Sequence, residues 1–399
     1  MCKISLNSQN ARNLYDFLGR RIEYNFWSIL KFRNKLALGA GIPLPDRQRD
    51  CGLNVVSNLD GDESVDVRQY KPKSYYKFTH LMLCGSRNCP RCAHMLAVGD
   101  VKEIVRASGD WQAVKGNTCL MLTETIQHNK YEGLDDLYNK MKLVKRHFNT
   151  RRDVRKAYGE LCCRVQCHAL ETPYGDNGWH LHYHVMLFCA GLLDGNGKDV
   201  ISRNAEILEN AWDDSCKKYG VSSIRGVSCR LNGAEHVKKY LSKQALEIAY
   251  GVGKTKPGRS HLVTPMKMLC SQYEGVSLID DGLQQQQKKF LEWHEFCRKR
   301  KVHHFGWSKG ASEIFPFIKG DDGDKLAEVE KESRVVAKIL NGVLLTRKFT
   351  SYELFQLQRF GMQNGLVELC KVLEDRGFNV IRELRENGDD ASSRTQENR

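Results

Sequence analysis

NGWHLHYHVMLF, residues 177–188, places histidines at every second position of an apolar run. Successive side chains of a β-strand point to opposite faces, so His180, His182 and His184 would share one face. The other face would be buried, and it carries Leu181, Tyr183, Val185 and Leu187. Two imidazoles at i and i+2 on a rigid sheet can hold one divalent cation. Solvent-facing histidines are the alternative, but three in register favour a metal-binding face.

The residues before this strand predict its neighbours. Residues 163–171, CRVQCHALE, alternate as a strand, and the turn YGDNG then leads into the histidine strand, which predicts a hairpin. Glu171 ends the first arm, where its carboxylate would be either a third metal ligand or a solvated side chain. Residues 118–127 predict a further strand, and apolar residues at helical spacing predict a helix over 134–148.

A cysteine-rich segment, CGSRNCPRCA, begins at Cys84 and also contains Cys89 and Cys92. Three thiolates this close suit zinc, which needs a fourth ligand to complete a tetrahedron. Cys51, His80 and His94 are the candidates for that ligand, and a redox motif is the alternative to a metal site. The chain has 15 cysteines, an odd number, mostly scattered and without an export signal, so most are expected to be reduced thiols.

Residues 233–250, GAEHVKKYLSKQALEIAY, predict a helix with an apolar stripe on one face. Its other face carries His236, Tyr240, Lys243 and Glu247 at i, i+4, i+7 and i+11. A tyrosine is thus presented outward with a lysine one turn away. Many surface helices share this pattern, so it gains meaning only beside the metal-binding strand.

The charge of the chain is unevenly distributed. Residues 321–399 hold 13 of the 62 Lys and Arg and 15 of the 48 Asp and Glu, so residues 1–320 hold 49 against 33, a net +16. A phosphate-rich partner explains this excess, because cationic surfaces bind and steer nucleic acid. The 399 residues predict two or three compact units, with no membrane-spanning run and no signal peptide, hence a cytoplasmic protein.

The last segment predicts a separate unit after an acidic linker, residues 321–332. VVAKIL is expected to form a helix, Thr350 and Glu353 form a capping box, and the helix NGLVELCKVLEDRG precedes the strand FNVIREL. This outline resembles a winged helix-turn-helix of phage and mobile-element proteins. The candidate recognition helix has more acidic than basic residues, so protein contact or dimerisation is as well supported as DNA binding.

The order of these motifs resembles that of the HUH endonucleases, specifically the plasmid-type rolling-circle replication initiators. The resemblance covers about residues 80–310 and is carried by MLTET, GWHLHYHVMLF and YLSK. CGSRNCPRCA, GRSHLVTPMKML, Trp293 and HFGWSKG also look like flanking segments of that family. The implied fold is α+β, a ferredoxin-like or RRM-like antiparallel sheet with helices on one face, followed by a small, mainly helical C-terminal unit.

By position, the resemblance implies that His182 and His184, with Glu171, bind Mg²⁺ or Mn²⁺, and that Tyr240 is the single nucleophile. Lys243 would bind phosphate or favour the ionised phenol, with an ordinary surface lysine as the alternative. Some relatives with one tyrosine place a water-activating glutamate a turn before it. Here Glu235 is five residues before Tyr240, roughly 140° away on an ideal helix, which leaves the termination step open.

The resemblance therefore implies an enzyme that nicks single-stranded, cruciform or supercoiled origin DNA and works with a host helicase and polymerase. A transposase or relaxase of the same superfamily and a non-catalytic zinc and DNA-binding regulator are the alternatives. The expected organisation is an N-terminal region of unassigned structure (1–75), an endonuclease domain (76–315) with a zinc motif at 84–92, a winged helix-turn-helix-like domain (325–388) and a disordered tail (389–399).

Overall fold

The structure is a computed structural model. It describes residues 26–52, 64–70, 75–78, 81–192, 197–233, 262–318, 334–342, 357, 360, 361 and 363–382. The chain divides into two compact units, one of residues 1–45 and 85–329, the other of residues 46–84 and 330–399. The second unit is therefore assembled from segments near both ends of the chain.

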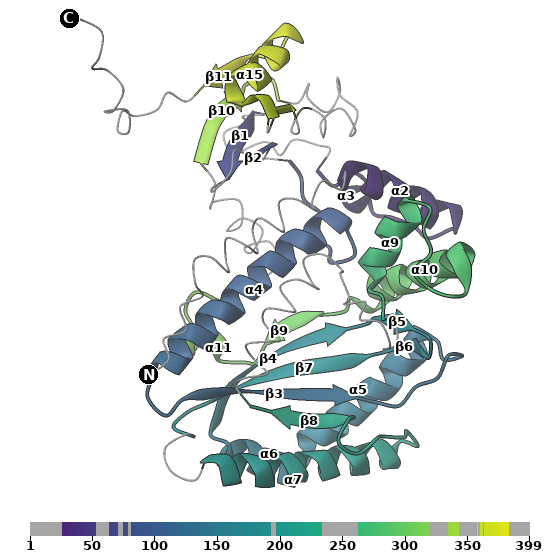
Figure 1. Ribbon diagram of the computed structural model, residues 1–399, viewed down its shortest axis with the longest axis vertical. Helices are drawn as coiled ribbons and strands as arrows, with labels where there is room; N and C mark the ends of the chain where they lie inside the picture. The colour runs from purple at the N-terminus through teal and green to yellow at the C-terminus, as the bar shows by residue number, and fades with distance from the viewer. Residues whose placement is uncertain are drawn as a thin grey trace, which may run out of the picture. The chain divides into compact units, whose positions relative to one another are not determined.

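The first unit is built on a five-stranded antiparallel sheet (Figure 1). Its spatial order is β8-β3-β7-β4-β9, with the histidine strand β7 in the centre. The strands predicted near residues 118–127, 163–171 and 180–188 are confirmed, and β4 and β7 pair as the predicted hairpin. The bounds are β3 Thr118–Thr125, β4 Cys163–Glu171, β7 His182–Cys189, β8 Cys229–Asn232 and β9 Phe305–Trp307.

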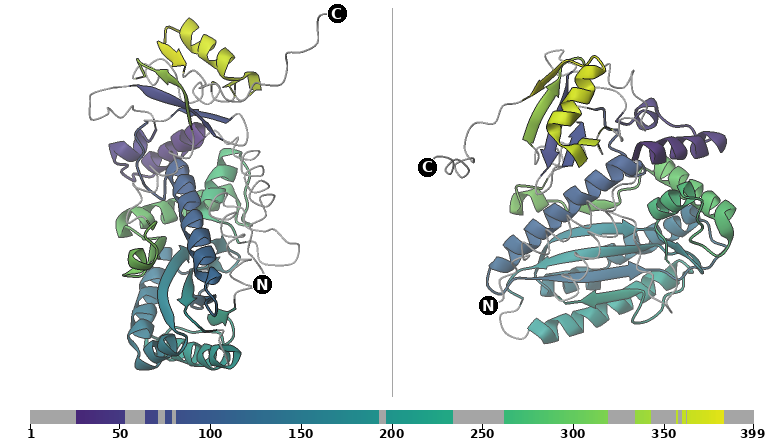
Figure 2. Two further views of the ribbon diagram at one scale, coloured as in Figure 1. Left: turned by 90° about the vertical axis from the view of Figure 1, so that its left-hand side faces the viewer. Right: turned by 45° about the horizontal axis from the view of Figure 1, so that its top comes forward.

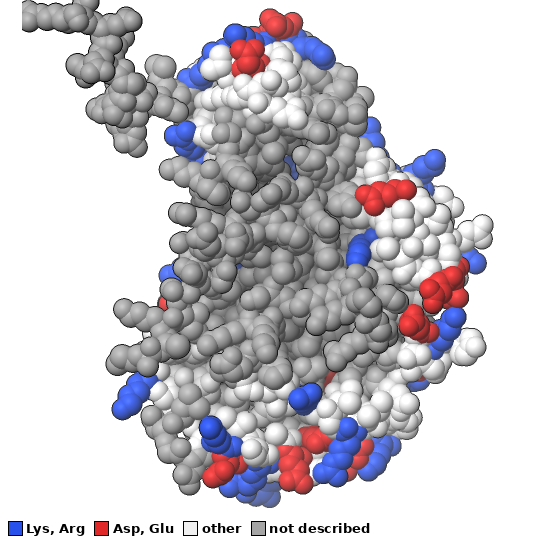
Figure 3. All heavy atoms as spheres, viewed as in Figure 1, with Lys and Arg blue, Asp and Glu red and all other residues white. Residues whose placement is uncertain are grey.

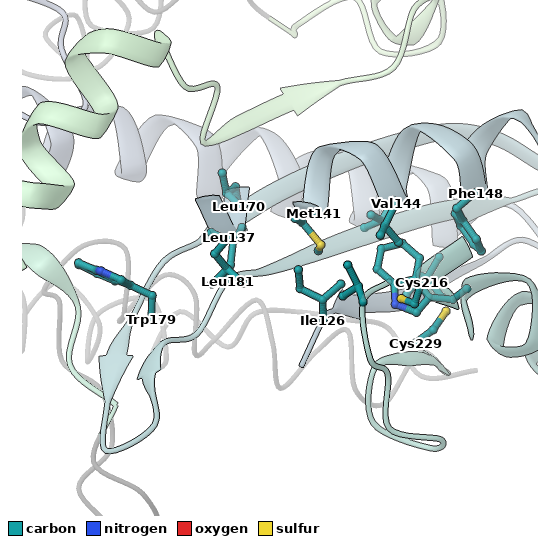
Figure 4. Packing of buried hydrophobic residues seen from close by; sticks show 14 of the residues in the cluster. Ile126, Leu137, Met141, Val144, Phe148, Leu170, Trp179, Leu181, Cys216 and Cys229 are labelled. Carbon is teal, nitrogen blue, oxygen red and sulfur yellow. The ribbon is translucent and has the colours of Figure 1, made fainter. Parts of the chain in front are cut away.

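One face of this sheet packs against helices that lie between its strands in sequence. Leu122, Val185 and Leu187 are buried there, as the alternation in the sequence predicted. The predicted apolar stripe of α5 belongs to the same core, with Met141, Val144 and Phe148 fully buried, and Figure 4 shows these three side chains. The helices on this face are α5 Leu134–Thr150, α6 Arg152–Glu160 and α7 Gly197–Lys218.

The opposite face is also covered by helices, which corrects the expectation of helices on one face only. Helix α4 (Pro90–Ala113) contributes Ile104 and Ala107 to a second core that includes Met186 and Phe188 of β7. The short helix α11 (Ala311–Ile314) joins the same core. Figure 2 shows the sheet between α4 and α5. The strands carry apolar residues on both faces over this part of their length, so both faces need cover.

A group of smaller elements closes the end of the sheet at which β7 begins. The two-residue strands β5 (Tyr174–Gly175) and β6 (Gly178–Trp179) extend the hairpin, and the N–H of Tyr174 donates to the Val263 carbonyl. Tyr174 and Trp179 are buried in the same core as Phe290. The helices of this group are α2 Phe26–Gly39, α9 Pro265–Tyr273 and α10 Gly282–Arg300.

The second unit contains a four-stranded antiparallel sheet of order β11-β10-β1-β2 and the helix α15. The helix expected at VVAKIL is wrong, because Arg334–Ile339 is strand β10, paired with β1. So short an apolar run fits either element, and β-branched Val335, Val336 and Ile339 favour the strand. The expected mainly helical unit is thus a mixed one. Its elements are α3 Asp46–Arg49, β1 Val65–Tyr70, β2 Tyr75–Phe78, α15 Leu366–Asp375 and β11 Val380–Arg382.

The fold class is α+β, as predicted. Among the residues that the structure describes, no helix is both long and apolar enough to cross a bilayer. None of the cysteines within these residues forms a disulfide bond, in agreement with the expectation that most are reduced.

Candidate functional site

The first candidate site lies where β4 ends and β7 begins. Glu171 is directly opposite His182 in the antiparallel pairing, and His184 lies two residues further along β7. The three side chains share one face, and one ligand atom from each lies within 4.8 Å of the other two. Glu171 Oε2 is 2.8 Å from His182 Nε2 and 3.7 Å from His184 Nε2. The hairpin thus brings together the three residues that the sequence predicted as a metal site.

Both imidazoles are oriented through their second nitrogen. His182 Nδ1–H donates to the His180 carbonyl oxygen at 3.3 Å, so in the neutral ring Nε2 carries the lone pair. His184 Nδ1 is hydrogen-bonded to the Thr123 hydroxyl on β3, at 3.2 Å. Partners of this kind fix the tautomer and direction of metal-binding histidines. Thr123 was not predicted, because its role depends on the pairing of β3 with β7.

The electrostatics of the group favour a cation. Burial alone would raise the pKa of Glu171, but the two neighbouring imidazoles outweigh it and hold the pKa well below its usual range. Glu171 is therefore a carboxylate that faces Nε2 of His182. An oxygen and a nitrogen 2.8 Å apart share a proton, and a metal ion bound by both would take the place of that proton. His182 is only 8% exposed, so water screens this interaction weakly.

Two imidazole nitrogens and one carboxylate oxygen suit a divalent transition metal, with the remaining coordination positions left for water or substrate. The donor set, the orientation of both rings and the charge of Glu171 all fit such an ion.

His180, the third histidine of the pattern, is held by a different partner. Its Nδ1 lies 2.9 Å from His128 Nε2, and His128 Nδ1–H donates to the Asn177 carbonyl at 3.1 Å. Because a carbonyl only accepts, the His180 Nδ1–H must donate to His128. Burial, aided by the neighbouring imidazoles of His182 and His128, lowers the pKa of His180 to about 3, so the ring is neutral. The contact of His128 with this strand could not be predicted from the sequence.

The second candidate site consists of Cys51, Cys84, Cys89 and Cys92, whose sulfur atoms all lie within 4.8 Å of one another. Of the three candidates for the fourth ligand, the structure therefore places Cys51 with the predicted trio. The position of His80 and the side chain of His94 lie outside the described residues.

The local structure around the four cysteines suits a metal site. Cys89 immediately precedes α4, which has Pro90 at its first position, and Cys92 follows in its first turn. The Cys84 N–H points at Cys51 Sγ, 3.4 Å away, and such a bond stabilises a thiolate. Four thiolates at about 2.3 Å from a tetrahedral zinc ion lie about 3.8 Å apart, so the cluster fits structural zinc.

The proposed nucleophile cannot be placed against either site. Tyr240, Lys243 and Glu235 lie in residues 234–261, outside the described part of the chain. Their roles stay predictions from the sequence.

The basic excess does not gather into one patch over α6 and α7. On the face drawn in Figure 3, basic and acidic side chains alternate at the lower end of the molecule, where these helices lie. Several are paired, among them Lys217 with Asp213 and Arg203 with Glu160. This edge is therefore close to balanced in charge.

Comparisons with models of protein families, with curated proteins and with solved structures found no match for this chain.

Proposed function

We propose that this protein is a metal-dependent DNA nickase and strand transferase that initiates rolling-circle replication. The observation that carries the proposal is the oriented Glu171, His182 and His184 group on the central strand of an antiparallel sheet. The motif order of the HUH endonucleases and the net charge of +16 over residues 1–320 support it. We also propose that the antiparallel sheet and its helices form a ferredoxin-like HUH fold.

In this proposal the three ligands hold Mg²⁺ or Mn²⁺, which when bound would polarise the scissile phosphate and stabilise charge on its oxygens. The Tyr240 phenol oxygen attacks the phosphorus, the bond from phosphorus to the 3′ oxygen breaks, and the phenol proton is lost to the surroundings. The 3′ oxygen leaves with a proton as a free hydroxyl, and the protein retains the 5′ phosphate. The 3′ hydroxyl then primes synthesis, which requires a host polymerase and helicase.

Because the phosphotyrosine keeps the free energy of the broken bond, a later 3′ hydroxyl can reseal the strand without ATP. The Cys51, Cys84, Cys89 and Cys92 group has a different role in this scheme. Its four sulfur ligands would fill a tetrahedral zinc ion and leave no position for substrate, so we assign it to structure.

The deciding experiment incubates the full chain with labelled single-stranded DNA from its own replicon, with Mn²⁺ or without divalent cation. We expect a metal-dependent covalent adduct that maps to Tyr240. Tyr240→Phe should bind the DNA and form no adduct, whereas Tyr250→Phe, altered ten residues further along, should react like the parent. An adduct formed by Tyr240→Phe would refute the assignment.

Two alternatives predict different products. A transposase or relaxase of the same superfamily would join transposon ends or transfer strands at a site other than a replication origin. A non-catalytic regulator would bind DNA and form no adduct under any metal condition, so Tyr240→Phe would match the parent in every assay.

A further inference from the structure

The turn of residues 129–132 presents an aromatic ring to solvent close to the metal ligands. Tyr131 is 94% exposed, the highest value among the exposed large hydrophobic side chains that the structure describes. It lies three residues after His128, whose imidazole bonds His180, and the His180 ring centroid is 4.9 Å from that of His182. A short series of direct contacts thus connects this turn to the Glu171, His182 and His184 group.

Hydrogen bonds hold the turn that carries this ring. The Tyr131 N–H donates to Asn129 Oδ1 at 2.9 Å, and the Glu132 N–H donates to the Asn129 carbonyl at 3.2 Å. The Glu132 carboxylate accepts from both the backbone and side-chain N–H groups of Asn129, and it also pairs with Lys140. The backbone on both sides of Tyr131 is therefore fixed, although its side chain packs on little.

The turn is also pressed against the hairpin that leads into β7. Gly178 has a φ of +90°, and a Cβ there would lie 2.8 Å from the Asn129 carbonyl oxygen. Only glycine allows this approach without strain. Lys130 adds a tether on the other side, since its ammonium pairs with Asp281 at 3.1 Å. Tyr131 is thus an exposed ring on a turn that hydrogen bonds and close packing hold against the hairpin with the three candidate metal ligands.

We infer that Tyr131 is a stacking platform for a nucleobase of single-stranded DNA next to the phosphate at the metal centre. The inference rests on the proposed function, which places a DNA strand there. Every base offers a π-face to an aromatic side chain, so a stacking ring adds affinity without a sequence requirement. A ring on a pre-ordered turn loses little conformational freedom when a base stacks on it, which makes the contact more favourable.

The test separates base stacking from phosphate attraction. The full chain is titrated, without added divalent cation, with a labelled dT 12-mer and with a 12-mer of abasic sites that carries the same phosphates. The dissociation constant of the abasic 12-mer divided by that of the dT 12-mer measures how much the bases contribute to affinity. Tyr131→Ala should reduce this ratio by about 5- to 150-fold, the range of one lost stacking contact, whereas Tyr131→Trp should retain it.

Tyr219→Ala is the matched control, because Tyr219 is also surface-exposed, at 38%, but follows α7 and contacts His147 on another element. Its ratio should equal that of the parent, and Mn²⁺ affinity should be the same in all four proteins. An unchanged ratio in Tyr131→Ala would overturn the inference and would mark the ring as a protein contact instead. An equal loss for both oligonucleotides would also overturn it. A parent that binds neither oligonucleotide would overturn the proposed function and this inference together.

Discussion

Replacement of Glu171 by glutamine is the most direct test of the metal centre. The substitution keeps the size of the side chain and one oxygen donor, and it removes the only negative charge among the three ligand residues. The contacts that orient the imidazoles, from the His180 carbonyl to His182 and from Thr123 to His184, do not involve Glu171 and should remain. The variant therefore isolates the contribution of charge to metal affinity.

The size of the effect can be bracketed from the structure. Loss of an outer partner of a metal ligand typically weakens binding by about 10- to 100-fold. Thr123→Val removes such a partner, the hydroxyl bonded to His184 Nδ1, at nearly constant volume, so its effect should fall in that range. Loss of the Glu171 charge should weaken Mn²⁺ binding by at least the upper end of this range, about 100-fold, which corresponds to about 2.7 kcal/mol of binding free energy.

Thermal unfolding with Mn²⁺ measures this difference. At a Mn²⁺ concentration about 1,000 times the parent Kd, binding stabilises the parent by about 4.1 kcal/mol and a variant with about 100-fold weaker affinity by about 1.4 kcal/mol. The unit of residues 1–45 and 85–329 has an unfolding entropy of about 0.6 kcal/mol/K, so the metal-induced rise in Tm should be smaller by about 4 °C in Glu171→Gln. Asp176→Asn, an exposed charge in the turn of the same hairpin, is the control and should respond like the parent.

Two results would refute this reasoning. One is a metal-induced rise in Tm that is the same in Glu171→Gln and in the parent. The other is a Thr123→Val variant with weaker Mn²⁺ binding than Glu171→Gln, since an outer partner should not outweigh a ligand.

Three further predictions concern stability. Lys145→Met should lower the free energy of unfolding, measured with urea, by about 3–5 kcal/mol, because the paired Glu124 carboxylate is 1% exposed and would lose its cation. The double variant with Glu124→Gln should recover part of this loss. Burial lowers the pKa of His168 to about 4 in the folded protein, so as the pH falls below 6.5 the unfolded chain binds a proton at this residue before the folded protein does. The free energy of unfolding should therefore be highest above pH 6.5 and should fall by up to about 3 kcal/mol towards pH 4. His168→Gln should remove this part of the pH dependence. Gly178→Ala should have a lower Tm than the parent. Gly159→Ala, whose added Cβ would meet nothing within 4 Å, should have a Tm no lower than that of the parent.

The histidine strand β7 could be predicted because its information is local. Alternation over residues 180–188 assigns His182 and His184 to one face and Val185 and Leu187 to the other, and the hairpin turn then fixes Glu171 opposite His182. Each step depends on residues within about a dozen positions of one another. Thr123, which orients the His184 ring, could not be predicted, because it comes from a strand some sixty residues earlier.

The second unit could not be predicted for the same reason. Strand β1 pairs with β10 so that Gln69 lies opposite Arg334, a separation of 265 residues. Neither segment shows by itself that it needs the other, and six residues of β10 are too few for periodicity to exclude a helix. The helix α15 was predicted correctly because its apolar stripe and the glycines at both ends lie within one short segment.

The register of β7 explains why fold and candidate chemistry depend on each other. A slip of one residue against β3 would turn Leu181, Val185 and Leu187 away from the core over α5 and would bury His182 and His184 in their place. Leu187 would exchange with an apolar neighbour, but the loss of burial for Leu181 and Val185, at about 1.5–3 kcal/mol each, is a large share of the stability of about 5–15 kcal/mol that most domains have. The hydrophobic face therefore selects the register, and the same register sets His182 opposite Glu171 and His184 opposite Thr123. A variant that weakens the apolar face, such as Val185→Thr, should accordingly lower Mn²⁺ affinity even though residue 185 points away from the ligands.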